Sequence, residues 1–532
     1  MTKEKAFRVL IPLVIIIYII VGRFLLLDYG VSRDERAERQ SLQVNMNYVT
    51  ELVTGQSDEN ITPLFEYKDK YYGMSAQFPM AVFEYLFKDN IRSIFLARHL
   101  YTFLFCCLGY ICFYLFTSKV FKSGAMGALG TAMVALYPRF FAEQFYNIKD
   151  MVFMSLFMIN LFVVYLLVEN GFKWRHCLLF ILVSAVSVNV RIMGAVFPAL
   201  VLGYMWVFGI REKREGEEKL FVKKALAQTL ALIFGILVLL VILTPVTWHS
   251  PIKQLVRMFK TFLDYGRWNG TIVFMGEALT KDQLPWYYVP VWLLISLPIW
   301  YIILGLAAVV LFVIAVAGAV RKKTKFNDIV LGNKYIILAF AAGFLPWLSV
   351  AITHATIYNG WRHLYFVMPS IVTVLLWAVK RLLGSGKLFR VSAMALIAAG
   401  LLTQVVWICK YHPYEYVYLN EIGSLFGDQF DRDYWTLSEY QAYEKIRDVN
   451  PELTGRDYFW MGSQGAGYFE YVLKDEEEEK VAVRADGYEY YAAFYRGVVG
   501  NEYTVEGFTE IDSIYVNGFK IASIYIKDGF EP

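Results

Sequence analysis

The chain has 532 residues, of which 57% are hydrophobic and 17% are aromatic. Its apolar residues come in runs of about 17–25, the length that crosses a hydrocarbon core of about 30 Å, which excludes an ordinary soluble protein. The formal net charge of +4 conceals an asymmetry: from Tyr411 onward the chain carries 24 acidic and 10 basic residues, whereas the rest carries 23 and 41. A basic membrane part and an acidic tail argue against nucleic acid as a partner.

The first apolar run extends from Phe7 to Leu27, with Lys3 and Lys5 before it and Arg8 at its start. It is long for a signal peptide and no small-residue cleavage site follows it, so we expect an uncleaved first helix with a cytoplasmic N-terminus. Ten further runs bring the predicted membrane spans to about eleven. They are residues 93–117, 124–138, 151–168, 177–190, 192–210, 225–246, 291–319, 335–353, 364–380 and 389–408. Only Arg191 separates the fifth and sixth spans, which predicts either two spans or one bent or re-entrant pair.

Alternate loops between these spans are rich in Lys and Arg, which is typical of cytoplasmic loops. The basic loops contain residues 119–122, 173–175, 211–224, 321–325 and 380–390. The sequence therefore predicts a multi-pass cell-membrane protein in the lipid bilayer, with its N-terminus in the cytoplasm and its C-terminal domain outside. All five cysteines lie in or at the end of apolar segments without metal-site spacing, so we expect the external parts to fold without disulfides.

The chain divides into a transmembrane domain, residues 1–410, and an extracytoplasmic C-terminal domain, residues 411–532. Within the first domain, residues 28–92 predict a long, compact polar loop outside the membrane. A second external loop, residues 247–290, contains an amphipathic stretch from Pro251 to Tyr265 that predicts a helix lying in the membrane interface.

The tail has the pattern of a small α/β domain. Trp435 to Val449 predicts a helix, residues 476–479 a solvated turn and residues 480–484 a strand. Two longer strands, residues 511–516 and 519–527, flank Asn517-Gly518, a strong hairpin signal. The predicted fold is therefore a polytopic α-helical membrane protein with a small C-terminal α/β domain.

Asp34 and Glu35 stand just beyond the first span, in a stretch from Ser32 to Gln40 that is too charged to enter lipid. One interpretation is a solvated, salt-bridged cap beside the membrane. The other is catalytic, because a carboxylate placed there can take a proton from an acceptor hydroxyl. A carboxylate of ordinary pKa suffices when the electrophile becomes strongly cationic in the transition state, as a sugar leaving a phosphate does.

Four cations lie at external positions where the positive-inside rule does not place them: Arg139, Lys149, Arg191 and Arg362. Interfacial snorkelling or structural pairing would explain each of them. The alternative is a phosphate cradle, because arginine gives bidentate contacts and lysine a mobile charge. Asn147 and Asp150 flank Lys149 and either orient it or, in the case of Asp150, hold a divalent ion. His363 follows Arg362 and is a further candidate donor, although a lone histidine there is more often structural.

These polar clusters share one side of the predicted membrane. A carboxylate pair with several cations suits a lipid-phosphate donor whose headgroup lies outside and whose polyprenyl tail lies between spans. Cleavage of a sugar–phosphate bond raises the negative charge on the phosphate, which fixed cations stabilise. The chain needs no Asp-x-Asp metal motif for this chemistry. No cofactor is certain, and a divalent cation stays open.

In these residues the chain resembles the membrane glycosyltransferases of the GT-C fold, specifically bacterial proteins similar to dolichyl-phosphate-mannose–protein mannosyltransferases. The resemblance covers the membrane part in order, up to about residue 435, and fades in the tail. The matching elements are Asp34-Glu35 with Arg39-Gln40, Pro138 to Phe141, Asn147 to Asp150, Arg191, Asn359 to His363, and His412 to Tyr416.

The resemblance implies an inverting transfer of a sugar from a polyprenyl-phosphate donor to an acceptor hydroxyl outside the cytoplasmic membrane. Asp34 would be the base, and Glu35 would orient the acceptor or tune Asp34. The cations of the cradle, with Asn147, Asp150 and His363, would be donor contacts. Two departures leave the acceptor open between a protein, a glycolipid and a cell-wall polymer. Charged residues stand beyond Glu35 where the family often has a histidine, and the tail has no trefoil-like repeat.

Two other functions stay open. A transporter or flippase of a lipid-linked solute usually places ionisable residues near the bilayer midplane on broken helices within repeats, whereas here the charges lie at one interface. A non-catalytic sensor or scaffold would use the C-terminal domain for binding. Transfer of sugar from a polyprenyl phosphate, lost in Asp34→Asn, separates the enzyme from both alternatives.

Overall fold

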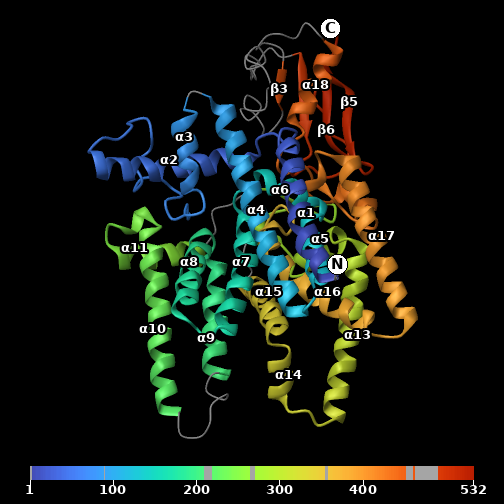
Figure 1. Ribbon diagram of the computed structural model, residues 1–532. Helices are drawn as coiled ribbons and strands as arrows, with labels where there is room; N and C mark the ends of the chain where they lie inside the picture. The colour runs from blue at the N-terminus through green and yellow to red at the C-terminus, as the bar shows by residue number, and fades with distance from the viewer. Residues whose placement is uncertain are drawn as a thin grey trace.

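The computed structural model describes residues 3–88, 90–208, 218–263, 270–353, 357–450, 459–461 and 489–531. Its helices form an upright bundle with a small β-sheet at one end (Figure 1). Within the described residues, seven helices are long and apolar enough to cross a membrane. They are α4 (Ile91–Phe121), α7 (Asp150–Glu169), α10 (Glu218–Ile242), α13 (Ile299–Arg321), α15 (Lys334–Thr353), α16 (Met368–Leu383) with the preceding 3-10 helix η5 (Arg362–Val367), and α17 (Lys387–Tyr411). The predicted polytopic helical fold is confirmed.

The remaining predicted spans coincide with α1 (Lys3–Leu25) and with three shorter apolar helices: α5 (Gly124–Ala135), α8 (Trp174–Val190) and α9 (Val196–Phe208). Arg191 ends α8 in an extended conformation, and the 3-10 helix η2 (Ile192–Ala195) leads into α9, so the predicted bend is present. The prediction of one span over 291–319 is wrong. Pro298 stands at the N-cap of α13 and separates it from α12 (Tyr288–Ser296), because a proline cannot donate a helical amide hydrogen.

The centre of the bundle is α7, which packs against α4 and α8. Its side chains are apolar around the whole helix, and most are buried, among them Met151, Phe153 and Phe157. A helix that is apolar on every face belongs in a protein core or in lipid. Because α7 begins at Asp150, the most constrained helix of the bundle also positions one of the predicted site residues.

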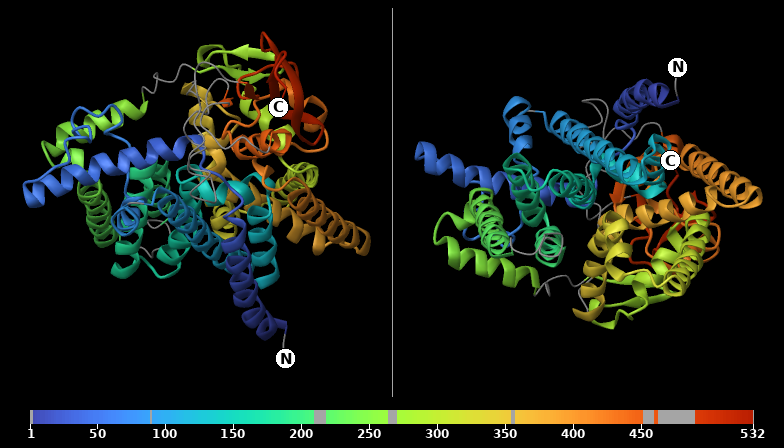
Figure 2. Two further views of the ribbon diagram at one scale, coloured as in Figure 1. Left: turned by 90° about the horizontal axis from the view of Figure 1, so that it is seen from above. Right: turned by 60° about the horizontal axis from the view of Figure 1, so that its bottom comes forward.

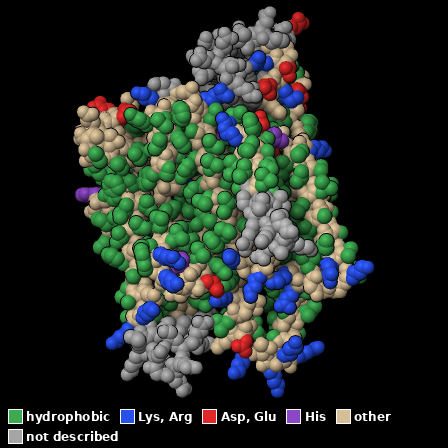
Figure 3. Space-filling model, viewed as in Figure 1, with side chains coloured by type: hydrophobic (Ala, Val, Ile, Leu, Met, Phe, Trp, Pro, Cys, Tyr) green, Lys and Arg blue, Asp and Glu red, His purple; other side chains and the backbone are tan. Residues whose placement is uncertain are grey.

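The outside of the bundle is apolar over most of the face shown in Figure 3. Leu306 is 65% exposed, and Phe312 and Leu402 are exposed to a similar extent, which is unfavourable in water but suits contact with lipid tails. Lys and Arg side chains gather at the lower end of this face. The connection from α13 to α14 (Phe326–Gly332) lies at that end, opposite the β-strands (Figure 1). The protein is therefore embedded in a membrane.

Residues 28–92 are not the long loop that their charge predicted. They contain α2 (Arg33–Thr54), the 3-10 helix η1 (Phe78–Met80) and α3 (Ala81–Leu86). The α2 helix lies across the top of the bundle (Figure 1) and buries Leu42 and Val44 on its inner side. It ends at Gly55, whose φ of 73° is the left-handed conformation that glycine favours at a helix C-terminus. A helix lying across the bundle leaves outward-facing charges such as Arg36 in water, which is why charge alone misled the prediction.

The predicted interfacial helix is present as α11 (Pro251–Leu263), after the 3-10 helix η3 (Pro245–Thr247). Its predicted end at Tyr265 lies outside the described residues. Met258 of α11 packs with Val44 of α2 and with Tyr67, and Figure 2 shows α11 beside the outer part of α2. The following segment forms a short hairpin that the sequence analysis did not predict, with strands β1 (Ile272–Phe274) and β2 (Glu277–Leu279), and then the 3-10 helix η4 (Lys281–Gln283).

The C-terminal domain begins with the 3-10 helices η6 (Glu415–Val417) and η7 (Gly423–Gln429) and continues with α18 (Glu439–Val449). The described strands form a sheet in the order β3-β4-β6-β5. Their bounds are β3 (Phe459–Met461), β4 (Tyr490–Phe494), β5 (Phe508–Val516) and β6 (Phe519–Lys527), with β3 and β4 parallel and the other pairs antiparallel. The small α/β domain is confirmed.

The hairpin between β5 and β6 is confirmed, since Asn517 and Gly518 both have the positive φ, 49° and 93°, that its tight turn requires. The helix α18 starts at Glu439, later than the predicted Trp435, because the positive φ of Asp433 and Thr436 prevents an earlier helix. The predicted turn at 476–479 and the predicted strand at 480–484 lie outside the described residues.

A polar cluster joins the end of α1 to the segment after α17. The Tyr29 hydroxyl donates to Oε2 of Glu415 at 2.9 Å, and the His412 ring contacts Oε1 of Glu415 at 2.7 Å and Oδ2 of Asp28 at 3.1 Å. Burial lowers the pKa of His412, but the two carboxylates outweigh it and raise the pKa above its ordinary value. The cluster therefore ties the first span to the C-terminal domain.

Candidate active site

The first turn of α2 contains Asp34 and Glu35, of which Glu35 is buried and Asp34 is half exposed. Glu35 is 2% exposed, and its Oε2 accepts a hydrogen bond from the backbone N–H of Ser32 at 2.7 Å, which satisfies a donor at the helix N-terminus. Its Oε1 lies 2.9 Å from Nε2 of His99 on α4. Glu35 therefore fixes the start of α2 in the bundle, and the expectation that it orients an acceptor gains no support from this placement.

Asp34 instead remains half exposed and makes an ion pair with Arg362. Its Oδ2 accepts a hydrogen bond from Nη1 of Arg362 at 2.8 Å, and the arginine side chain is 5% exposed. Burial raises the pKa of Asp34, but the charge and hydrogen bond of Arg362, followed by the charges of Arg496 and Lys149, hold the pKa below its ordinary value. Asp34 is thus an accessible carboxylate that stays ionised at neutral pH.

Arg362 begins η5 and is almost enclosed by aromatic rings. Its guanidinium carbon lies 4.7 Å from the ring centroid of Trp435 and 5.1 Å from that of Tyr358. Stacking of this kind fixes a planar guanidinium group. Its Nε is buried and has no hydrogen-bond partner within the described residues. His363 packs edge-on against Tyr358, with ring centroids 4.6 Å apart, and lies within electrostatic reach of Arg362, Arg191 and Lys149.

Lys149 reaches the same region but already has a carboxylate partner. Its Nζ lies 2.8 Å from Oε1 of Glu38, one turn beyond Asp34 on α2, and 3.6 Å from the ring centroid of Tyr72. The other oxygen of Glu38 accepts a hydrogen bond from Gln77 at 2.7 Å. These contacts orient Lys149. Asn147 contacts only the backbone N–H of Lys149, at 3.3 Å, so the expectation that Asn147 and Asp150 orient its side chain gains no support within the described residues.

Asn147, Asp150 and Arg191 form the third polar group. Asn147 ends the short helix α6 (Pro138–Tyr146), and its Oδ1 accepts a hydrogen bond from the backbone N–H of Asp150 at 2.8 Å. The Asp150 carboxylate accepts hydrogen bonds from Nδ2 of Asn147 and from Nη2 of Arg191. Asp150 therefore pairs with the arginine at the bend between α8 and η2.

Arg139 lies apart from this group. It is 2% exposed, its Nε donates to the backbone carbonyl of Tyr418 at 2.8 Å, and its guanidinium carbon lies 5.5 Å from the Trp292 ring. These contacts fasten α6 to the segment that enters the C-terminal domain. Among the described residues, Arg362 and Lys149 act on Asp34, whereas no contact links Arg139 to it, and the surroundings of Arg139 are those of a structural arginine.

Glu143, one turn further along α6, is fully buried and accepts three hydrogen bonds. The donors are the hydroxyls of Tyr434 and Tyr365, at 2.6 and 2.8 Å, and Nδ2 of Asn147, at 2.7 Å. Burial raises the pKa of Glu143 above its ordinary value, although the three hydrogen bonds act in the opposite direction. The three donors come from η5, from the C-terminal domain and from the end of α6. Glu143 therefore holds these three elements together behind Arg362, and they are called the wall behind Arg362 below.

Three charged residues near Asp34 were not predicted from the sequence. Glu38 pairs with Lys149, as described, and Arg33 and Arg496 lie close enough for their charges to act on each other. Arg33 and Glu38 could have been found, since they belong to the same charged stretch as Asp34. Nothing near Arg496 in the sequence distinguishes it, because it follows strand β4 about 460 residues beyond Asp34.

Within the described residues no group of three or more His, Cys, Asp and Glu side chains could hold a metal ion. Asp150, the residue considered for a divalent ion, is occupied by Arg191 and Asn147. The polar groups that converge on Asp34 are therefore cations and hydrogen-bond donors, a set that suits an anion.

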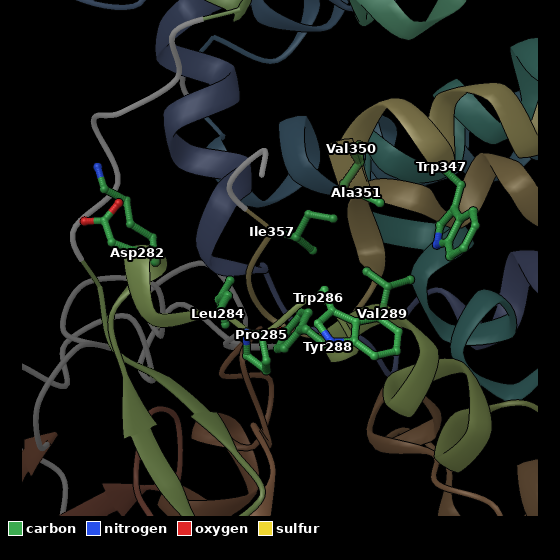
Figure 4. Close-up of a pocket in the computed structure, with 11 residues that line it drawn as sticks. Asp282, Leu284, Pro285, Trp286, Tyr288, Val289, Trp347, Val350, Ala351 and Ile357 are labelled. Atoms are coloured by element: carbon green, nitrogen blue, oxygen red, sulfur yellow. The ribbon is translucent and has the colours of Figure 1, made fainter. Parts of the chain in front are cut away.

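A cavity of about 220 Å³ lies behind the Arg362 loop, between the 281–289 segment and α15 (Figure 4). Most of its lining residues are hydrophobic, among them Leu284, Trp286, Trp347, Val350 and Ile357, and Lys281 and Asp282 add polar surface. Tyr288, another lining residue, accepts a hydrogen bond through its hydroxyl from the backbone N–H of Gly360 at 3.2 Å, two residues before Arg362. The cavity thus combines a mixed polar and apolar lining with a direct connection to the segment that carries the buried arginine.

No protein-family model and no curated protein matches this sequence. Among solved structures, the chain is similar to two crystal structures of ArnT from Cupriavidus metallidurans, one bound to undecaprenyl phosphate and one in the apo state. The sequence identity is 11% in both, over 96% of this chain and 97% of the other, and the TM-scores are 0.46 and 0.45. A similarity this distant carries no argument about the chemistry of the site.

Proposed function

We propose that the protein is a membrane glycosyltransferase that moves a sugar from a polyprenyl-phosphate donor to an acceptor hydroxyl, with inversion, outside the cytoplasmic membrane. The observation that carries the proposal is the pair formed by Asp34 and Arg362. An accessible, ionised carboxylate lies 2.8 Å from a buried arginine at the start of an apolar span. This is the arrangement that a base and a phosphate-binding cation need at the head of a lipid-borne substrate.

Asp34 is suited to the role of base. Its Oδ2 is held by Arg362, and its Oδ1 has no hydrogen bond within the described part of the chain, so that oxygen is available to an acceptor hydroxyl. A general base of this kind contributes about 10²–10⁴-fold to a rate. The low pKa of Asp34 makes it a weak base, which is adequate where the sugar carbon carries much positive charge in the transition state.

Arg362 is suited to stabilise the departing phosphate. Its Nη1 contacts Asp34 while its buried Nε is unpartnered within the described residues, so one guanidinium group can bridge the base and the phosphate. Charge develops on the phosphate oxygens as the sugar leaves, and a fixed donor at that point typically contributes about 10²–10³-fold. Lys149 and Arg191 add positive potential nearby.

The remaining parts of the proposal concern the substrates. The polyprenyl chain would lie along apolar surface near the 220 Å³ cavity, and the acceptor would approach Asp34 from outside. The family resemblance makes a polyprenyl-phosphate mannose the first donor to test. A protein, a glycolipid and a cell-wall polymer all stay open as acceptors, and so does a requirement for a divalent cation. The N-terminus would be cytoplasmic and the C-terminal domain external.

The test uses the purified full-length protein with a panel of polyprenyl-phosphate sugars. We expect release or transfer of sugar by the wild type, and a loss of at least about 10²-fold in Asp34→Asn with unchanged thermal stability. Glu51→Gln, an exposed carboxylate on the same helix, is the matched control and should retain full activity. Full activity of Asp34→Asn would remove the assignment of the base. Movement of an intact lipid-linked sugar across vesicles without transfer would favour a flippase.

A further inference from the structure

Helix α11 is held against α2 by one of its sides. Gln254 and Met258 of α11 are buried. The Tyr71 hydroxyl donates to Oε1 of Gln254 at 2.8 Å, and Met258 packs with Val44 of α2. These contacts fix the rotation of α11 about its own axis. The opposite side of the helix is uncovered within the described part of the chain, so its side chains are available to a partner.

The uncovered side of α11 carries two neighbouring stripes of residues. Ile252 and Val256, one turn apart, are 82% and 49% exposed and form an apolar stripe. Lys253, Arg257 and Lys260 are exposed and are spaced four and three positions apart, so they form a basic stripe directly beside the apolar one. These five residues are called the outer face of α11.

The positive charge of the outer face is not compensated nearby. Helix α11 contains no Asp or Glu, and no ion pair joins its three cations to a carboxylate within the described residues. Elsewhere, Lys and Arg side chains gather at the opposite end of the bundle (Figure 3), as they do at the cytoplasmic ends of membrane spans. That bias does not account for three cations at the end of the bundle that carries α2.

Helix α11 starts where a membrane span ends. The apolar helix α10 ends at Ile242, whose side chain is 55% exposed, and only the short helix η3 separates it from Pro251. Trp248 lies between them, is 40% exposed, and donates through its indole N–H to the carbonyl of Val241 at 2.9 Å. Tryptophan is enriched at the boundary between hydrocarbon and headgroups. Figure 1 shows α11 at the end of α10, and Figure 2 shows it at the edge of the bundle, which places the outer face at headgroup level.

This combination favours a lipid surface over a protein partner. A stable protein–protein interface covers about 800 Å² on each partner, whereas the apolar stripe consists of two side chains. Two apolar side chains beside a row of cations are instead suited to a helix lying in the membrane interface, with the apolar stripe among the acyl chains and the cations at the phosphates. A zwitterionic surface would accommodate the apolar stripe, but only an anionic surface would offset the three charges.

We propose that the outer face of α11 binds the headgroups of anionic phospholipids, in the leaflet at which the candidate active site lies. The leaflet follows from the packing of α11 on α2, the helix that also carries Asp34. The inference goes beyond an interfacial helix, because it names the class of lipid and the three side chains that select it. It does not rest on the proposed function, and it holds or fails whatever reaction the protein catalyses.

The test uses the full-length protein in phosphatidylcholine nanodiscs, without any transfer reaction. A fluorophore attached to Ile252→Cys reports on the lipids beside the outer face, and the unmodified chain, which has five cysteines, gives the labelling background. The probes are phosphatidylglycerol and phosphatidylcholine, each with a quencher on one acyl chain and each added at the same small fraction. We expect phosphatidylglycerol to be enriched about fivefold over phosphatidylcholine beside the fluorophore, the ratio expected for one cation near an anionic headgroup. The enrichment should fall at high salt, since exposed charges are screened.

A triple variant removes the basic stripe and leaves the rest of the helix unchanged. It combines Lys253→Gln, Arg257→Gln and Lys260→Gln, and the enrichment of phosphatidylglycerol should disappear while quenching by phosphatidylcholine persists. The matched control removes the same number of charges from exposed positions around the start of α17, at the opposite end of the bundle, and should keep the enrichment of the parent protein. It combines Arg381→Gln, Lys387→Gln and Arg390→Gln. Thermal unfolding checks that both variants are folded, which we expect because all six side chains are exposed.

Three results would overturn the inference. Equal quenching by the two lipids in the parent protein would show that the outer face does not select anionic headgroups. An enrichment that persists in the triple variant would assign the selection to another part of the protein. Quenching by neither lipid would show that the outer face lies away from the bilayer, and a soluble partner would then be its occupant.

Discussion

The Nζ atom of Lys149 lies 2.8 Å from Oε1 of Glu38, and the two residues are 111 positions apart in the chain. The lysine that the sequence offers as a phosphate ligand is therefore neutralised before any donor arrives. Arg191 is in the same position, since Asp150 is its partner. Lys149 adds to the positive potential at Asp34 and Arg191 to that at His363, and the buried Nε of Arg191, like that of Arg362, has no hydrogen-bond partner within the described residues.

We therefore expect Lys149→Ala and Arg191→Ala to weaken donor binding by about three- to tenfold, because each removes one charge near the phosphate. Acceptor binding should change by less than about twofold, since no acceptor contact is proposed for either residue. Titration of donor and acceptor against each variant measures this, with Lys527→Ala, which replaces an exposed cation of the C-terminal domain, as the control. A defect confined to the acceptor would contradict the placement of these cations beside the donor.

Arg362→Gln should change the pH dependence of the reaction. The arginine holds the pKa of Asp34 below its ordinary value, while burial acts in the opposite direction, so its removal must raise that pKa. A base works only when deprotonated, and the acidic limb of a plot of kcat/KM against pH should move to higher pH in the variant. Residual activity of Arg362→Gln is enough for the measurement. If the acidic limb stayed at the same pH as in the wild type, a group other than Asp34 would be responsible for it.

The depressed pKa of Asp34 also affects the stability of the folded protein. A carboxylate whose folded pKa is depressed stabilises the protein above its ordinary pKa of about 3.9, and this contribution disappears as the pH falls through the folded value. The difference in thermal stability between the wild type and Arg362→Gln should therefore shrink toward acid pH.

Glu143→Ala should destabilise the fold by about 2–4 kcal/mol, because the hydroxyls of Tyr365 and Tyr434 and the amide of Asn147 lose a shared buried acceptor. Glu143→Gln keeps one acceptor oxygen at the same place and should cost less. Thermal unfolding of both variants in detergent tests the order. Equal stability of the Ala variant and the wild type would mean that this network does not support the wall behind Arg362.

The proposed topology is testable with two single-cysteine additions. Lys322→Cys, in the connection after α13, should be protected from an impermeant thiol reagent in intact cells, whereas Glu502→Cys in the C-terminal domain should react. The unmodified chain, which has five cysteines, gives the background. Reaction at Lys322→Cys together with protection at Glu502→Cys would place the site on the cytoplasmic side and contradict the proposal for an external acceptor.

Much of the fold could be predicted because its signals are local. The apolar runs gave the spans, Asn517-Gly518 gave the hairpin, and Arg191 marked the bend between α8 and α9. The errors were local as well. The charge of α2 concealed a helix that lies across the bundle, and Pro298 divided a span that hydropathy joined.

The site could be predicted only in part, since it depends on pairing across the chain. The structure brings Arg362 and Lys149 into electrostatic contact with Asp34, and Arg191 with His363, but it places Arg139 elsewhere and turns Glu35 into the bundle. The partner of Lys149 and the approach of Arg496 follow from tertiary packing, which no spacing along the sequence records. Periodicity along the sequence predicts helices, whereas tertiary packing determines which charged side chains pair.

The contact between Tyr29 and Glu415 joins residues that are 386 positions apart. At about 5–20 residues per second, a ribosome needs roughly 20–80 s to add the intervening chain. During that interval the first helix is already inserted while the carboxylate that its end must meet does not yet exist. Maturation of this protein is thus delayed until translation is nearly complete, and a nascent chain stalled within the last span should leave its first helix without the partner of Tyr29.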